Sequence, residues 1–212
     1  MRKGETTMNS KYKKTLCAVL CVLLMGSLLG CGSVSSSANT TAASLILASD
    51  VTVGTETAEA DEILISLSDA GSASDSAAVS IDGSTVTITA EGTYRLSGTL
   101  SDGQIVVSAP EDAKVKLILD GADIPRSGSA AILALSADKV IVASAEGSVN
   151  KVSSTGEFDA ADSIDAAIFA KCDLNLNGDG ILYVSCETGH GVVTKDDFKM
   201  KDGTVSITAA KK

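Results

Sequence analysis

Short runs of alternating apolar and polar residues cover most of the chain after residue 80. A period of two places successive side chains on opposite faces of a β-strand, so each run predicts a strand. Asp-Gly and Asn-Gly pairs, which favour turns, separate the runs. No segment after residue 31 has the periodicity of an amphipathic helix. The pattern predicts an all-β fold, with strands at Val86/Ile88, Tyr94/Leu96, Ile105/Val107, Val115/Leu117/Leu119, Val140/Val142, Leu174/Leu176, Leu182/Val184 and Val205/Ile207.

A second pattern is the similarity of residues 167–176 to residues 191–200, which lie 24 positions later. A fainter copy occupies residues 131–140, with Ile132 36 positions before Ile168, and the extra twelve residues can form a loop. Self-similarity of this kind is typical of stacked strands, in which equivalent side chains lie about 4.8 Å apart and suit a polymeric ligand. The stacking predicts inward side chains at Ile168, Leu174, Leu176, Leu182, Val184, Val192, Phe198, Val205 and Ile207.

The N-terminal residues have the order of a secretory signal peptide. Lysines at residues 11–14 precede an apolar run over residues 16–24, and Leu-Leu-Gly-Cys follows at residues 28–31. These four residues resemble the lipobox of bacterial lipoproteins, which implies cleavage before Cys31 and lipidation of its thiol. A transmembrane anchor is the alternative, but the run is shorter than the roughly 20 residues that span a bilayer. We predict a signal peptide at 1–30, a polar tether at 31–60, and a folded domain at 61–212 held outside the cell by a lipid anchor in the membrane.

The charge balance narrows the possible partners. The chain has 17 basic and 27 acidic side chains, a formal net charge of −10. Removal of residues 1–30 takes away five basic residues and one acidic residue, which leaves 12 minus 26, or −14. Phosphate contacts need clustered Lys and Arg, so this balance argues against a nucleic-acid partner. Carboxylates and backbone carbonyls can instead supply the oxygen ligands that calcium takes.

Two cysteines remain in the predicted folded domain, Cys172 and Cys186. An oxidising compartment permits a disulfide between them, worth about 3 kcal/mol for a loop of this size in the chain-entropy model. The alternative is a pair of small buried thiols on neighbouring strands. The sequence favours neither.

Several motifs in order carry a family resemblance over residues 83–210. They are Glu-Gly-Thr-Tyr-Arg-Leu-Ser-Gly at 91–98, Asp-Gly-Gln-Ile-Val-Val at 102–107, Leu-Asp-Gly-Ala-Asp-Ile at 119–124, two Lys-x-Asp copies, and His190-Gly191. This stretch resembles bacterial extracellular proteins described as carbohydrate-binding domain-containing. The resemblance implies a right-handed single-stranded parallel β-helix that binds calcium and pectin-like acidic polysaccharide. It also implies a likeness to polysaccharide lyases without established catalysis.

The two Lys-x-Asp copies depart from the family pattern, which usually has Lys-Asp-Asp twice. Here the first copy is Lys171-Cys172-Asp173, and only the second, Lys195-Asp196-Asp197, is complete. A thiol is a poor calcium ligand, so we expect a weak calcium site at Asp173, Asp196 and Asp197. Lys171 and Lys195 are the candidates for contacts with sugar carboxylates. Family chains usually continue through further coils, so we also expect this β-helix to be incomplete at its C-terminus.

The sequence therefore predicts a non-enzymatic, extracellular lipoprotein that binds acidic polysaccharide, with calcium as a structural or bridging ion. One alternative is a polysaccharide lyase in which Lys171 or Lys195 removes the proton next to a calcium-bound uronate carboxylate. Another is a structural adhesin or spacer without a ligand. His190 is more often a turn or ladder residue than a base, and the three tyrosines are too scattered for an aromatic sugar platform.

Overall fold

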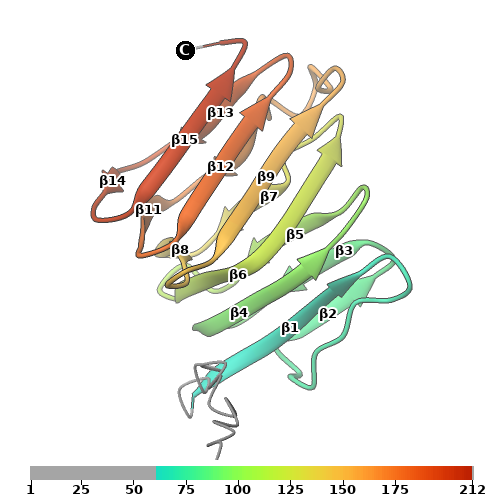
Figure 1. Ribbon diagram of the computed structural model, residues 1–212, viewed down its shortest axis with the longest axis vertical. Helices are drawn as coiled ribbons and strands as arrows, with labels where there is room; N and C mark the ends of the chain where they lie inside the picture. The colour runs from blue at the N-terminus through green and yellow to red at the C-terminus, as the bar shows by residue number, and fades with distance from the viewer. Residues whose placement is uncertain (1–60, 212) are drawn as a thin grey trace, which may run out of the picture. The chain divides into compact units, whose positions relative to one another are not determined.

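The computed structural model describes residues 61–211, whose regular structure is entirely β-strand (Figure 1). Within this part of the chain no helix is long and apolar enough to cross a membrane. The predicted signal peptide (1–30), the predicted tether (31–60) and Cys31 lie outside the described residues. The strands are β1 (Glu62–Ser68), β2 (Val79–Asp82), β3 (Thr85–Ile88), β4 (Gly92–Thr99), β5 (Gln104–Ser108), β6 (Lys114–Ser127), β7 (Ile132–Ser136), β8 (Lys139–Ser144), β9 (Val149–Thr155), β10 (Ala166–Ala170), β11 (Asp173–Gly178), β12 (Ile181–Cys186), β13 (His190–Thr194), β14 (Phe198–Met200) and β15 (Thr204–Ala209).

The strands form two sheets whose members are mostly parallel. A nine-stranded sheet has the order β14-β11-β8-β6-β9-β12-β15, with β4 also beside β6 and β1 beside β4. A six-stranded sheet has the order β13-β10-β7-β5-β3-β2. Every pairing between these strands is parallel except that of β2 with β3. Strand β6 pairs with β8 through its first half and with β9 through its second half, so it contributes to two parts of the larger sheet.

Three-strand units stack on one another in the C-terminal half. The units are β7-β8-β9, β10-β11-β12 and β13-β14-β15, and each strand pairs in parallel with its equivalent in the next unit. Ile168 pairs with Val192 and Leu174 with Phe198, both at the 24-residue spacing seen in the sequence. Ile132 pairs with Ile168, 36 residues later. The segments predicted to lie side by side therefore do so in the predicted register.

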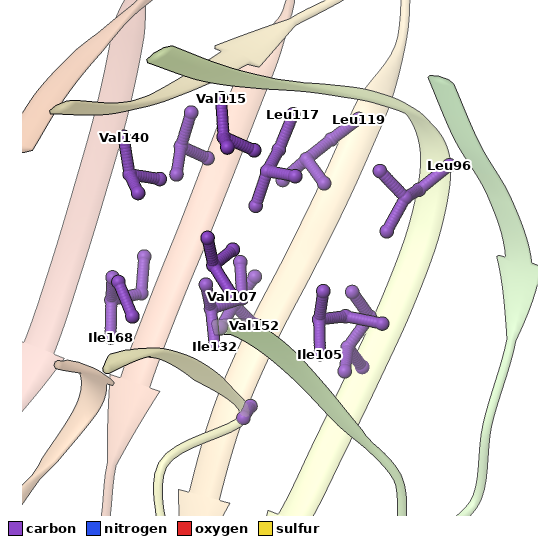
Figure 2. Packing of buried hydrophobic residues seen from close by; sticks show 14 of the residues in the cluster. Leu96, Ile105, Val107, Val115, Leu117, Leu119, Ile132, Val140, Val152 and Ile168 are labelled. Atoms are coloured by element: carbon purple, nitrogen blue, oxygen red, sulfur yellow. The ribbon is translucent and has the colours of Figure 1, made fainter. Parts of the chain in front are cut away.

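The main core lies between the sheets and is built from the inward side chains of successive strands (Figure 2). The predicted inward residues of the second unit, Ile168, Leu174, Leu176, Leu182 and Val184, are buried, with at most 2% of their surface exposed. These five assignments are confirmed. Alternating apolar residues explain this burial, because every second side chain of a strand points to the same side.

Two residues of the third unit lie at the predicted inward positions but are not buried. Phe198 is 47% exposed and Ile207 is 49% exposed, although their partners one unit earlier, Leu174 and Val184, are buried. The reason is that no strand within residues 61–211 pairs with the outer edges of β13, β14 and β15. Val192 and Val205, also predicted to be inward, are only partly buried and pack against the main core.

A smaller core lies on the outer side of the six-stranded sheet. It contains Leu133 and Phe169, both buried, and the partly buried Ile164 packs against it. Ile164 belongs to the segment between β9 and β10, so the extra residues predicted to form a loop do form one. This loop explains why Phe169 is only 1% exposed on a face that would otherwise meet water.

A buried asparagine at the start of β9 forms hydrogen bonds that connect β6, β9 and β12. The Asn150 side chain is fully buried, and its Oδ1 accepts a hydrogen bond from the Ala122 N–H at 3.0 Å. Its Nδ2 donates to the Ser148 Oγ at 2.8 Å and to the Ile181 carbonyl at 3.3 Å. A buried backbone amide without a partner is costly, so this side chain stabilises the bend in the middle of β6.

Candidate functional site

One outward surface of the nine-stranded sheet aligns side chains from five neighbouring strands in rows. The register places Thr93, Lys116, Ile141, Asn175 and Lys199 in a single row across β4, β6, β8, β11 and β14. Neighbouring parallel strands lie about 4.8 Å apart, so each row presents side chains at that regular interval. We call this surface, formed by β4, the first half of β6, β8, β11 and β14, the row face.

Two adjoining hollows form a groove over the row face. The larger has a volume of about 720 Å³ and the smaller about 510 Å³. Thr93 and Lys116 line both hollows, so the hollows meet at these two residues. The larger hollow extends over the strand ends to the turns that contain Glu146, Asp179 and Asp202. The groove therefore crosses the strands and is lined mainly by charged and polar side chains.

A tight corner after β11 forms one end of the larger hollow. Gly178 has a φ of 109°, a backbone conformation that side chains with a Cβ rarely adopt. A Cβ placed on Gly178 would lie 2.2 Å from the Ser144 carbonyl oxygen at the end of β8. Glycine is thus required for the chain to turn from β11 into β12 while it stays in contact with the neighbouring unit.

Arg95 of β4 is held in the groove by two carboxylates. Its guanidinium donates to Glu62 through Nε at 2.7 Å and Nη2 at 3.2 Å, and to Asp120 through Nη1 at 3.2 Å. The hydrogen bond to Glu62 raises the pKa of Arg95 above its ordinary value, against a smaller opposing effect of burial. The side chains of Arg95 and Glu62 are only 14% and 7% exposed. Because two anions already neutralise this cation, Arg95 serves mainly to order the wall of the groove.

Three lysines on the row face form what we call the lysine cluster: Lys114, Lys116 and Lys139. Lys116 is one row from Arg95, and Lys114 and Lys139 share the row beyond it. Lys114 and Lys139 pair directly on neighbouring strands, and Lys116 follows two residues after Lys114 on the same side of β6. Lys139 makes an ion pair with Asp173 at 3.2 Å. None of the ion pairs found within residues 61–211 involves Lys114 or Lys116. The cluster therefore carries two cations without an anionic partner in the described part of the chain.

The structure does not assemble the predicted calcium ligands into one site. The Asp173 carboxylate is bound to the Lys139 ammonium. Asp196 and Asp197 are exposed in the turn after β13, where the Asp197 N–H donates to the Asp196 Oδ1 at 3.0 Å. Among the described residues, no group of three or more His, Cys, Asp and Glu side chains could hold a metal ion. Calcium takes six to eight oxygen ligands, so this donor set does not fit it.

The predicted sugar-contacting lysines lie away from the row face. Lys171 and Lys195 follow β10 and β13, whose last residues, Ala170 and Thr194, are paired, so the two lysines occupy neighbouring levels as expected. The Lys195 ammonium lies 5.3 Å from the centre of the Phe169 ring, a cation–π distance. Lys195 therefore packs against the smaller core on the outer side of the six-stranded sheet.

The two domain cysteines are free thiols, and both are buried. The two buried thiols agree with the second of the alternatives that the sequence left open, except that Cys172 precedes β11 and Cys186 ends β12, which are not neighbouring strands. Burial, followed by the nearby Asp173 charge, raises the pKa of the Cys172 thiol above its ordinary value. Cys172 is thus a small core residue at the start of β11. The single histidine, His190, lies 3.6 Å from Asp165 through its Nε2.

Sequence reasoning missed Arg95 and the lysine cluster. A signal was present, because Lys114 and Lys116 alternate with the inward residues Val115 and Leu117 and must therefore share the outward face. The lysine that completes the cluster, Lys139, comes from the next strand of the sheet. Its position depends on pairing register, which the alternation within one strand does not specify.

The parallel strands, their in-register rows and the groove define an all-β protein with a long, regular surface. Residues 82–212 match the family described as carbohydrate-binding domain-containing protein, and the chain belongs to this family. Arg95 and the whole lysine cluster lie within the matched residues.

Two known proteins are similar to this chain, one in sequence and one in structure. A carbohydrate-binding domain-containing protein of Acetivibrio thermocellus is 34% identical over 128 residues, which are 58% of this chain and 45% of that protein. This chain thus spans about half the length of the curated relative. A solved structure of a polysaccharide lyase-like protein from C. thermocellum, a gadolinium derivative, has a TM-score of 0.62 and 29% identity. That similarity covers 70% of this chain and 61% of the other.

Proposed function

We propose that this protein is a surface-anchored, extracellular lipoprotein that binds acidic, pectin-like polysaccharide along the row face. The observation that carries the proposal is the groove that crosses in-register strands in a member of a carbohydrate-binding family. A polysaccharide is a long ligand with a repeating pattern of polar groups, and the row face repeats its own polar groups at strand spacing. The groove is lined by both acidic and basic side chains, and its unpaired lysines, Lys114 and Lys116, are suited to contact an anionic chain. No part of the proposal depends on calcium, because the three predicted carboxylates do not fit that ion.

The proposal includes a finer description of the fold, a right-handed single-stranded parallel β-helix. Support comes from the three stacked units, in which each strand pairs with its equivalent one unit later. In such a fold every unit is one turn of the helix, and a groove parallel to the helix axis crosses all turns. The polysaccharide would then lie along the axis and contact one turn after another.

A binding panel tests the proposed function. The full chain is mixed with insoluble pectate, with an insoluble neutral glucan and with an uncharged resin, and the bound fraction is measured after washing. We expect retention on pectate above that on the resin. Equal retention on all three materials would favour the alternative of a structural adhesin or spacer.

The anchor is tested separately through Cys31. Cys31→Ser removes the thiol that lipidation requires, so we expect the variant to be released from the membrane fraction or to keep its leader. Mass spectrometry of the membrane-bound protein would detect the lipid in the unaltered chain. Unchanged mass and unchanged fractionation of the variant would refute the anchor while leaving polysaccharide binding open.

The proposal describes binding without catalysis. The competing lyase hypothesis has one observation in its favour, the similarity to a protein described as polysaccharide lyase-like. Lyase action on a uronate chain creates a carbon–carbon double bond that absorbs ultraviolet light. Incubation of the full chain with polygalacturonate, with and without added calcium, should leave the absorbance unchanged. A steady rise that Lys195→Gln or Lys171→Gln abolishes would establish the lyase instead.

A further inference from the structure

We infer that the lysine cluster binds the anionic groups of the polysaccharide directly, without a bridging calcium ion. The inference rests on the proposed function and names the contacts that would carry it. It differs from the arrangement implied by the family resemblance, in which carboxylates of the protein and the sugar share a cation.

The three ammonium groups of the cluster lie on one face of two neighbouring strands. Lys114 and Lys139 lie on neighbouring strands about 4.8 Å apart, and Lys116 lies on the same side of β6, two residues from Lys114. Like charges at this separation repel one another. Asp173 compensates Lys139, and Glu91 is the one carboxylate that lines the smaller hollow with Lys114 and Lys116. A bound anion would relieve the repulsion, so the cluster is suited to an anionic ligand.

Lys116 lies where the two hollows of the groove meet. It is only partly exposed, it forms none of the ion pairs found within residues 61–211, and it lines both hollows where they meet. Its neighbours in the row, Thr93 and Ile141, carry no charge. A ligand that lies along the groove must therefore pass this unpaired ammonium group.

The predicted calcium ligand that lies on the row face, Asp173, is already neutralised. Asp173 stands in the same row as Lys114 and Lys139 and bonds to Lys139 at 3.2 Å. A cation at this point would have to displace the lysine and would face two further ammonium groups. Electrostatics at this part of the row face thus favours an anion over a cation.

The spacing of the lysines also indicates how the sugar chain would run. Adjacent strands are separated by a distance close to the length of one pyranose residue. A uronate chain that crosses the strands could place successive carboxylates near Lys114 and Lys139, and Lys116 lies beside Lys114 on the same face of β6. Sulfate esters offer the same charge with a different shape, so carboxylate and sulfate sources must be separated by experiment.

The test measures affinity of the full chain for polygalacturonate by calorimetry, first in EDTA and then in calcium chloride. We expect the dissociation constant in EDTA to stay within about twofold of that in calcium. Lys116→Gln should weaken binding about fivefold, and Lys114→Gln with Lys116→Gln about tenfold or more. Lys116→Arg keeps the charge and should retain most of the affinity. Higher sodium chloride should weaken binding of the unaltered chain, since exposed charges are screened.

Lys151→Gln is the matched control, because Lys151 is an exposed strand lysine on β9, outside the row face, where it pairs with Asp123. It should change affinity less than twofold, and melting curves should show that each variant is folded. Weaker binding of dextran sulfate than of polygalacturonate supports carboxylate recognition, and the reverse order overturns that assignment. Loss of binding in EDTA, or an unchanged Lys114→Gln/Lys116→Gln variant, would overturn the inference while the proposed function stands. A chain that binds no polysaccharide in either buffer would overturn both.

Discussion

The buried Asn150 offers the sharpest test of the structure, because its replacement has a cost that can be worked out bond by bond. Asn150→Ala removes three hydrogen bonds, at 3.0, 2.8 and 3.3 Å. Each bond contributes about 1 kcal/mol net, and a buried group left unpaired costs about 1–3 kcal/mol. The Ala122 N–H would be left in this state, since Ala122 is 1% exposed. We expect the free energy of unfolding to fall by about 3–4 kcal/mol.

Urea unfolding of the full chain, followed by circular dichroism, measures this loss. With a slope of about 2 kcal/mol per molar urea, the midpoint should fall by roughly 1.5–2 M without a change in slope. Asn175→Ala is the control, because Asn175 is the same residue type on the row face, where it is only partly buried. It should cost less than about 0.5 kcal/mol. If the two variants unfold at the same midpoint, the Asn150 network does not stabilise the fold as argued.

Three further predictions concern the glycine corner, the two cores and the buried thiol. Gly178→Ala should lower the free energy of unfolding by about 2 kcal/mol or more, because its Cβ would meet a carbonyl oxygen at 2.2 Å and its φ is 109°; urea midpoints check this. Phe169→Ala should lower the free energy of unfolding by about 3 kcal/mol and Phe198→Ala by much less, since the exposed fractions of the two side chains are 1% and 47%. Urea unfolding measures both losses, and equal losses would contradict the burial of Phe169 and the exposure of Phe198. Above pH 9.0, the ordinary pKa of a thiol, stability should fall, because Cys172 ionises in the unfolded chain before it does in the folded one, where its pKa is raised. Cys172→Ala should lose this part of the pH dependence, and an unchanged profile in urea titrations would show that the thiol does not contribute.

The sequence predicted the strands and their neighbours well, for a simple physical reason. Alternation identifies inward residues one strand at a time, and the similarity of residues 167–176 to residues 191–200 aligns whole strands. Together they place Ile168 beside Val192 and Leu174 beside Phe198, as the pairing confirms. The same reasoning could not predict that Phe198 is exposed. Burial of a stacked strand depends on the strand above it, which no property of Phe198 itself reveals.

The candidate site was harder to predict, because it depends on side chains from strands distant in sequence. Asp173 was expected to bind calcium with Asp196 and Asp197, yet its carboxylate bonds to Lys139, which lies 34 residues earlier and directly beside it in the sheet. Strand register decides between these two partners. Local sequence around Asp173 contains the acid but not the lysine that neutralises it.

The stacking of three-strand units also predicts which unit unfolds locally most easily. The unit β10-β11-β12 has a neighbouring unit on both sides, whereas β13-β14-β15 has a paired strand on one side only within residues 61–211. In quasi-one-dimensional folds, stability is close to a sum of unit and interface contributions, so each unit can open by itself. Amide hydrogens of β13, β14 and β15 should therefore exchange with solvent long before those of β10, β11 and β12. The row face, which draws most of its residues from the interior strands β4, β6, β8 and β11, would stay intact through these local openings.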